Sequence, residues 1–209
     1  MQNRLSLPVG RFLLGKGPAL DARQRAVLDW AEVDDHHAVL DVDCGGGELL
    51  MRLKERYCLR ACGMVKAGVR QAIDAEQASQ GLEILREDYS DIPWRDNSFD
   101  AVFITKGLGV SRQTDAFLQE IIRVLKPGGR LLAVSSCFFP ALPLGKRRAR
   151  QISESDINSN PFALMNRFEL CGFTDVTMRY SRFRYATVIA RKAEPVLFPA
   201  SDRLAVQDS

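Results

Sequence analysis

The amino-acid sequence predicts an α/β fold: one mixed sheet of seven strands, mostly parallel, with helices on both faces. Short apolar runs alternate with segments of helical period along most of the chain. This alternation is typical of parallel strands joined by crossover helices. The last two apolar runs have only "SR" at their junction, so they are expected to pair as a hairpin, with the last strand antiparallel.

The candidate strands are short apolar runs, each bounded by Gly, Pro, Asp or Asn. In chain order they cover residues 38–43, 59–65, 82–86, 99–105, 129–136, 174–180 and 183–191. Helical patterns between the earlier runs define two apolar faces. The first face contains Leu49, Leu50, Leu53 and Tyr57, and the second contains Phe117, Ile121, Val124 and Leu125.

A further helix is bounded by clear end signals in "NPFALMNRFELCGF". Asn160 is a candidate N-cap and Pro161 occupies the first helical position, where its missing N–H costs nothing. Gly172 lies just past the expected end. The pattern predicts a short helix that stops before the hairpin.

Length and composition fit a single domain outside the membrane. The chain has 209 residues, of which 46% are hydrophobic, enough for a sizeable core. No run approaches the roughly 20 apolar residues that span a bilayer, and the apolar stretch near the start is too short for a secretory signal. We expect a soluble, cytoplasmic protein with no membrane partner.

The cysteine and charge patterns favour neither a metal site nor nucleic acid binding. The five cysteines include no C-x-x-C pair and only two histidines are present, so reduced thiols and no metal site are expected. The net charge of +3 is most concentrated in "GKRRAR", residues 145–150, which is more typical of a solvated loop than of a phosphate site. No aromatic-interleaved basic groove or recognition helix is evident.

A glycine cluster follows the first strand, in "AVLDVDCGGGELL", residues 38–50. In an open parallel α/β sheet, ligands bind beyond the carboxyl ends of the strands. Gly45, Gly46 and Gly47 allow close approach of the backbone, and the helix starting near Gly47 offers free N–H groups. A plain tight turn rarely needs three glycines, so the cluster predicts a ligand site without naming the ligand.

Three segments, in this order, carry a family resemblance: "AVLDVDCGGGELL", "EDYSDIPWRDNSFDAVFITKGL" and "FLQEIIRVLKPGGRLLAV". Together they resemble the class I S-adenosylmethionine-dependent methyltransferases, especially the type 11 small-molecule methyltransferases, over about residues 20–191. The resemblance implies a Rossmann-like fold, S-adenosylmethionine as cofactor and methyl transfer to a small-molecule acceptor.

The resemblance also implies roles for individual residues. Asp41, Gly45 and Gly47 would cradle the methionine end of the cofactor. Asp88, with Tyr89 beside it, would bind the adenine amino group. The expected cofactor-binding residues are Asp41, Asp43, Cys44, Gly45, Gly47, Val65, Lys66, Asp88, Tyr89 and Thr105. Thr105 and Lys106 would face the cofactor and the acceptor.

The family's domain organisation places variable segments over the site. We expect a single methyltransferase domain over residues 1–192, followed by a flexible tail over 193–209. Residues 1–30 would form an N-terminal cap or helix and residues 137–160 a variable loop over the site. Phe138 and Phe139 in that loop are candidates for lining an apolar acceptor site, although plain packing explains them equally well.

Two departures from the family pattern concern the cofactor. Asp43 stands where the family has its first glycine, and aspartate is among the few residues that tolerate a left-handed backbone. Val65 stands where the family has an acid that grips the ribose hydroxyls. Losing these hydrogen bonds is expected to lower cofactor affinity by roughly ten- to several hundredfold.

These departures leave an alternative function open: a non-catalytic relative that acts as a binding or regulatory partner. A nicotinamide dinucleotide reading is disfavoured, because the third glycine of G-x-G-x-x-G would fall at Leu50 and the ribose acid is absent. Lys66 and Arg70 could bind a 2′-phosphate, but we favour the simpler interpretation that they are exposed cations at the start of a helix. The sequence leaves open whether the chain forms a homo-oligomer.

No general base is evident. His36 and His37 precede the first strand and are therefore expected at the wrong edge of the sheet. The catalytic candidates at the correct edge are Tyr89, Lys106 and Cys137, each also explained by packing or by lining the substrate. This favours an acceptor that is already nucleophilic, such as a thiolate, an amine or an activated carbon.

Overall fold

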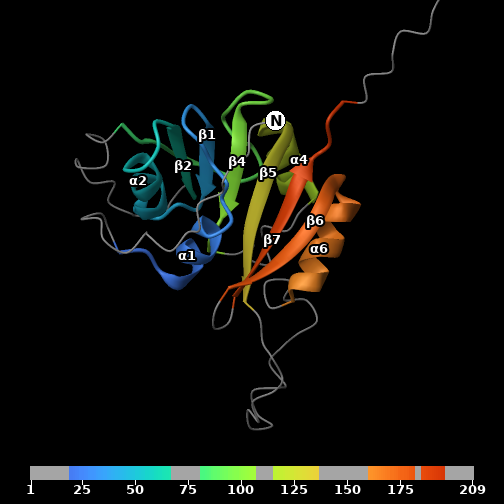
Figure 1. Ribbon diagram of the computed structural model, residues 1–209. Coiled ribbons are helices and arrows are strands. Elements are labelled where there is room, and N and C mark those ends of the chain that lie inside the picture. Colours follow the sequence, from blue (N-terminus) through green and yellow to red (C-terminus); the bar gives the residue numbers. More distant parts are fainter. Residues whose placement is uncertain (1–18, 67–80, 107–114, 137–159, 182–184, 196–209) are drawn as a thin grey trace, which may run out of the picture.

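Seven strands form one sheet in the order β3-β2-β1-β4-β5-β7-β6 in the computed structural model (Figure 1). The structure describes residues 19–66, 81–106, 115–136, 160–181 and 185–195. The strands are β1 (Ala38–Val42), β2 (Arg60–Lys66), β3 (Glu83–Glu87), β4 (Phe99–Ile104), β5 (Leu125–Ser136), β6 (Phe173–Ser181) and β7 (Tyr185–Lys192). The described helices are α1 (Ala22–Leu28), α2 (Glu48–Lys54), α4 (Asp115–Val124) and α6 (Pro161–Leu170).

The sheet is mixed at one end, as the sequence predicts. β1 pairs in parallel with β2 and β4, and the parallel pairing continues outward to β3 and β5. β7 runs antiparallel to both β5 and β6, so among these strands β7 alone has the opposite direction. The last strand of the chain therefore lies inside the sheet, between β5 and the edge strand β6.

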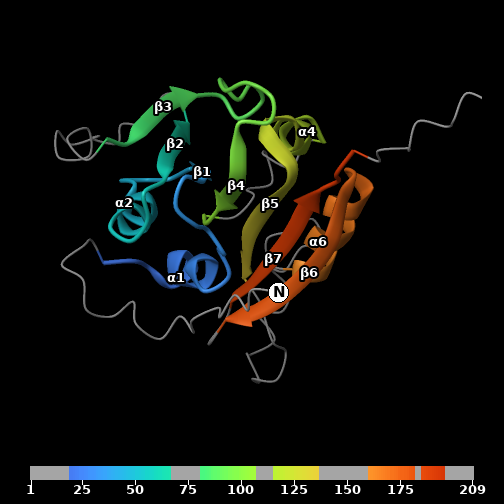
Figure 2. The same cartoon turned by 45° about the horizontal axis from the view of Figure 1, so that its top comes forward.

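Helices cover both faces of the sheet (Figure 2), which confirms the predicted layers. α1 and α2 cover one face, where Leu49 packs in one core with Phe103 of β4. α4 and α6 cover the other face, where Phe117 and Phe168 join a second core with Val102 of β4. No described helix is both long enough and apolar enough to cross a bilayer.

The predicted end signals of α6 are confirmed. The Asn160 side chain accepts hydrogen bonds from the backbone N–H groups of Phe162 and Ala163, at 3.1 and 3.2 Å. Pro161 is the first helical residue, and Gly172 follows the helix with a φ of 98°. A left-handed glycine at this position is a common way to end a helix.

Two helix ends differ from the sequence prediction. α2 ends at Lys54, so Tyr57 lies past the helix, because β2 begins at Arg60 and the chain must turn back to the sheet. α4 ends at Val124 and Leu125 begins β5. The reason is Pro127, which disfavours helical backbone at the residue before it.

α1 is held in place by elements far along the chain. Thr187 of β7 donates from Oγ1 to the Ala26 carbonyl oxygen at 3.0 Å, across 161 residues of sequence. Arg130 of β5 donates to the carbonyl oxygens of Trp30 and Ala31. Strands β5 and β7 therefore fix the position of α1, the first described helix.

Candidate functional site

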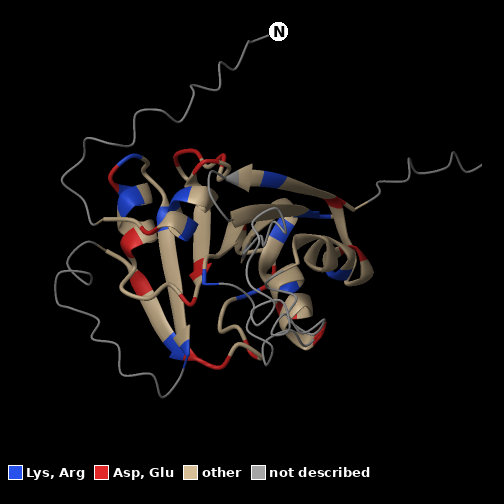
Figure 3. Cartoon of the chain, turned by 90° about the horizontal axis from the view of Figure 1, so that it is seen from below, with Lys and Arg blue, Asp and Glu red and all other residues tan. Residues whose placement is uncertain are grey.

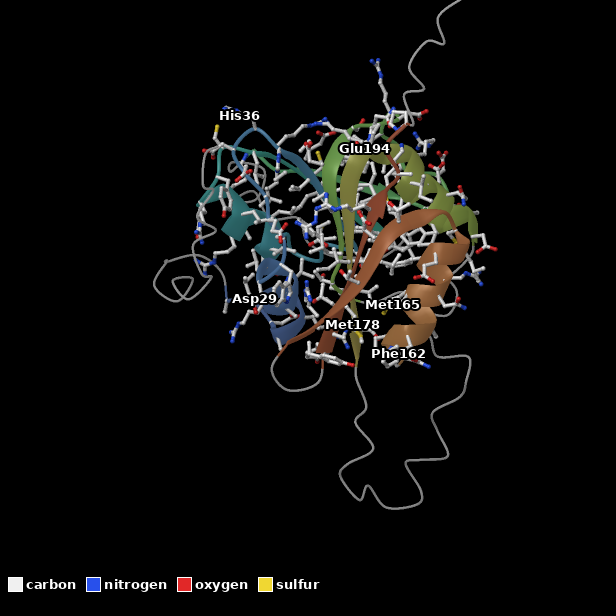
Figure 4. The ribbon with its side chains drawn as sticks, turned by 45° about the vertical axis from the view of Figure 1, so that its right-hand side comes forward. Asp29, His36, Phe162, Met165, Met178 and Glu194 are labelled. Atoms are coloured by element: carbon white, nitrogen blue, oxygen red, sulfur yellow. The ribbon has the colours of Figure 1, made fainter. Side chains whose placement is uncertain are left out.

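The carboxyl ends of the parallel strands lie at one edge of the sheet, the lower edge in Figure 1. Figure 3 looks onto this edge, and the described acidic and basic segments are interspersed there. The predicted ligand positions lie at the last residues of β1 and β2 or directly after β1, β3 and β4, and therefore come to the same edge. His36 lies at the opposite edge (Figure 4), as the sequence predicts.

The loop after β1 has a left-handed backbone at three positions. The φ angles of Asp43, Gly45 and Gly47 are 63°, 61° and 78°. Most residues with a side chain avoid this conformation, but aspartate tolerates it, so the turn forms with Asp43 at the family's first glycine position. Gly47 also has a packing reason: a Cβ there would lie 3.1 Å from Leu82 Cδ1.

The loop rests directly on β2, at a contact that the sequence reasoning missed. The Cys44 N–H donates to the Met64 carbonyl oxygen at 3.1 Å. A Cβ on Gly63 would lie only 2.6 Å from Cys44 Sγ and 3.0 Å from Leu50 Cδ1. Gly63 therefore permits the close approach, and the signal for this was a glycine inside a strand pattern.

Asp41 carries a buried carboxylate beside this loop, at the end of β1. Within the part of the chain that the structure describes, neither of its carboxylate oxygens has a hydrogen-bond partner. Burial raises the pKa of Asp41 well above its ordinary value, and Lys106 opposes that rise. Three acidic side chains raise the pKa further: Asp43, Glu48 and Asp21. Burying a carboxylate without a partner is costly, so this group is suited to a cationic ligand.

The segment after β4 forms the other side of the site. Thr105 is buried and Lys106 is exposed, and the Lys106 charge acts on Asp41. α1 contacts both sides: Arg23 Nη1 donates to the Lys106 carbonyl oxygen at 3.3 Å, and Gln24 Nε2 donates to Glu48 Oε2 at 3.5 Å. The N-terminal end of α1 thus links the segment after β4 to the first turn of α2.

The predicted ribose position is apolar and buried. Val65 is 1% exposed and packs in the core beneath α1 and α2. Its neighbour in the β3 register is Arg86, while Lys66, one residue on, is exposed and pairs in register with Glu87. A carboxylate introduced at position 65 would therefore lie next to Arg86, its register partner on β3.

Asp88 and Tyr89 follow β3 but have different surroundings. Asp88 is exposed at the edge of the sheet, where the family resemblance places the adenine contact. Tyr89 is buried, with its ring packed edge-on against Phe117 of α4 at a centroid distance of 6.0 Å. The ring of Tyr89 thus belongs to the apolar core on the α4 side.

Several sequence-based expectations fall outside the described residues. They concern Cys137, Phe138, Phe139 and Arg70, the basic run 145–150, and Arg182 of the "SR" junction, whose Ser181 is the last residue of β6. The same applies to residues 1–18 of the expected cap, to nearly all of the expected loop 137–160 and to residues 196–209 of the expected tail.

Comparisons with known protein sequences converge on methyl transfer. A family model described as a methyltransferase domain matches residues 40–133. The demethylmenaquinone methyltransferase of Thermus thermophilus is 37% identical over 137 residues, covering 64% of this chain and 60% of the relative. The ubiquinone/menaquinone biosynthesis C-methyltransferase UbiE of Cereibacter sphaeroides is 35% identical over 126 residues, covering 56% and 48%. The chain thus spans about half to three fifths of these relatives' length.

Solved structures with the same fold have low sequence identity. Phosphoethanolamine N-methyltransferase 2 of Haemonchus contortus, solved with S-adenosyl-L-methionine, gives a TM-score of 0.65 at 16% identity, covering 85% of this chain and 54% of that one. Geranyl diphosphate C-methyltransferase of Streptomyces coelicolor gives 0.62 at 16% identity, covering 82% and 79%. The [4+2]-cyclase SpnF gives 0.62 at 19% identity, covering 82% and 80%. At these identities the similarity shows the fold.

Proposed function

We propose that the chain is a class I methyltransferase that transfers a methyl group from S-adenosylmethionine to a small-molecule acceptor. The relatives named methyltransferases favour an enzyme over a non-catalytic binding partner. Since the chain spans only part of those relatives, the reaction is a proposal that the residues of this chain must support.

The observation that carries the proposal is the buried carboxylate of Asp41. Its two oxygens have no hydrogen-bond partner within the described residues, and three further acidic side chains act on it. S-adenosylmethionine has an ammonium group and a sulfonium that activates its methyl group. An acidic, buried position at the ligand-binding edge of the sheet suits such a cation.

The other residues would divide the remaining contacts. The loop of Asp43, Cys44, Gly45 and Gly47 would lie along the methionine portion, and its left-handed glycines leave room for close approach. Asp88 would accept from the adenine amino group, and Thr105 and Lys66 would border the site. Lys106, the cation that acts on Asp41, is suited to the ligand's carboxylate.

The acceptor is proposed to be nucleophilic on its own. His36 and His37 are the only histidines of the chain, and they precede β1 at the far edge. Catalysis would then depend on proximity and orientation rather than on a histidine base. Relatives are named for C-methylation and for demethylmenaquinone. We therefore favour an activated carbon over a thiolate or an amine. Lys106, Tyr89 and Cys137 remain candidates for contacts with the acceptor.

The remaining expectations stay part of this proposal. They are a single domain over residues 1–192 with a cap and a variable loop over the site, a cytoplasmic location and no nucleic acid partner. Assembly into a homo-oligomer is left open alongside a monomer.

Titration of the purified chain with S-adenosylmethionine and S-adenosylhomocysteine tests the cofactor. Because Val65 replaces the ribose acid, we expect a Kd on the order of 10 μM to 1 mM, measured by calorimetry and by thermal shift. No heat and no thermal shift at millimolar ligand would instead support the non-catalytic alternative.

Val65→Asp is expected to tighten S-adenosylhomocysteine binding by about tenfold, because a carboxylate at the end of β2 can accept hydrogen bonds from the ribose hydroxyls. Val65→Asn is the matched control, since an asparagine side chain has nearly the same shape as an aspartate side chain but no charge. Equal affinities of the two variants, with both folded by circular dichroism, would show that the ribose does not lie against this position.

A further inference from the structure

The connection between β3 and β4 is docked along one face of α4 (Figure 2). Three helix residues at successive turns hold it. Tyr89 packs on Phe117, the Ile92 N–H donates to Glu120 Oε2 at 3.1 Å, and Arg123 Nη1 donates to the Trp94 carbonyl oxygen at 2.7 Å. The connection is therefore fixed to the helix from its beginning to its middle.

Arg123 uses every donor of its guanidinium in this contact. Nε and Nη2 donate to the two carboxylate oxygens of Glu120 at 2.8 and 2.7 Å. Nη2 also donates to the Ile92 carbonyl oxygen at 2.8 Å, and Nη1 donates to Trp94 and to Asp96 Oδ1 at 2.7 and 2.9 Å. These are the five N–H bonds that arginine has, in the planar arrangement that suits paired acceptors.

Glu120 and Arg123 also fix each other's charge. The hydrogen bonds from Arg123 lower the pKa of Glu120, and those to Glu120 raise the pKa of Arg123. Glu120 Oε2 accepts from both Ile92 and Arg123, so the pair acts as one unit that holds both the N–H and the carbonyl oxygen of Ile92.

The residue that this unit holds, Ile92, lies only a few residues after Asp88 in the chain. The Asp91 N–H donates to the Asp88 carbonyl oxygen at 3.3 Å, which closes a turn directly before the buried Ile92. On its other side, Asp88 follows Glu87, which pairs in register with Lys66 of β2. Asp88 is thus an exposed side chain on a short turn whose two ends are both fixed.

We propose that Glu120 and Arg123 are positioning residues that set Asp88 for the adenine of the cofactor. This inference rests on the proposed function. With valine at the ribose position, the adenine contact provides a larger share of the nucleoside recognition. An exposed carboxylate discriminates between donor and acceptor groups only when its backbone is held in place.

The test compares S-adenosylhomocysteine with its purine riboside analogue, in which a hydrogen atom replaces the adenine amino group. The wild-type chain is expected to prefer the adenine ligand by about tenfold or more, since only that ligand offers Asp88 an N–H donor at this position of the ring. In Arg123→Lys, whose single ammonium cannot hold Glu120 and two carbonyl oxygens together, the preference is expected to fall towards one. Glu120→Gln keeps an acceptor for Ile92 and should give an intermediate preference.

Arg130→Lys is the matched control. Arg130 also joins an acidic side chain, Glu32, to two backbone carbonyl oxygens, but at residues 30–31 rather than near Asp88. The variant Arg130→Lys should have a lower melting temperature than the wild type but the same preference between the two ligands. Should Arg123→Lys and Glu120→Gln lower stability yet retain the wild-type preference, the pair is merely structural and the inference is wrong. If neither ligand binds the wild-type chain, the proposed function itself fails, and the inference fails with it.

Discussion

Asp41→Asn is expected to stabilise the free protein while weakening its binding of S-adenosylmethionine on the order of a hundredfold. The loss of affinity would follow from removing a buried charge that faces the ligand's cation in the proposed site, in a position where water cannot compensate. The gain in stability follows from the same burial, because the native fold must either keep a charge that has no hydrogen-bond partner among the described residues or take up a proton. Calorimetry and urea unfolding measure the two effects separately.

The stability difference should depend on pH with a defined sign. The pKa of Asp41 in the folded chain is raised, so between the ordinary value of 3.8 and that raised value the folded state binds more protons than the unfolded state. The stability of the wild type therefore contains a term that falls as pH rises through this window, by about 1.4 kcal/mol per pH unit. The asparagine side chain of the variant does not titrate, so the advantage of the variant should grow with pH.

An exposed aspartate supplies the control for this prediction. Asp175 lies on β6, and its side chain is 74% exposed. Asp175→Asn should leave the affinity for S-adenosylmethionine unchanged. A stability difference for Asp41→Asn that stays flat between pH 4 and pH 8 would contradict a buried, raised-pKa carboxylate.

Gly63→Ala is expected to destabilise the fold by about 1–3 kcal/mol and to weaken cofactor binding, although residue 63 lies on β2 and outside the loop. The added Cβ would lie 2.6 Å from Cys44 Sγ, so the Cys44 side chain, or the loop after β1 that carries it, must shift. Chemical unfolding and ligand titration on the same preparation measure both losses.

A double variant distinguishes this contact from a general intolerance of β2. Cys44→Ala removes the sulfur that the new methyl group would meet, so Gly63→Ala in that background should cost clearly less than in the wild type. Strictly additive losses in the two single variants and the double variant would show that the Cys44 contact is not the cause.

Much of the fold could be predicted because its signals are local. The alternation of strand and helix patterns gave the sheet, and Asn160, Pro161 and Gly172 gave the limits of α6. The errors came where neighbours decide the outcome. Tyr57 fits the apolar face of α2, but the helix stops three residues earlier so that the chain can reach β2.

The candidate site was predicted less completely because its support is tertiary. The motif around the glycine cluster identified Asp41 and the left-handed loop. It gave no indication of Gly63, whose importance depends on Cys44 packing across the strand. Glu120 and Arg123 lie in the third segment of the family motif, yet their contacts with Ile92 span 28 and 31 residues. Tyr89 has a place in the motif, but only the packing of α4 shows that its ring is in the core.

The position of β7 inside the sheet sets the order in which the molecule can be completed on the ribosome. Within the described sheet, β6 pairs with β7 alone, so it has no partner strand until the final strand has been synthesised. One of the hydrogen bonds that hold α1 depends on the same strand, since Thr187 of β7 donates to the Ala26 carbonyl oxygen. Arg23 and Gln24, which join the two sides of the site, are carried by α1. A nascent chain that has exposed every glycine-loop residue therefore still lacks part of the support of the candidate site, which comes with the last, long-range contacts of folding.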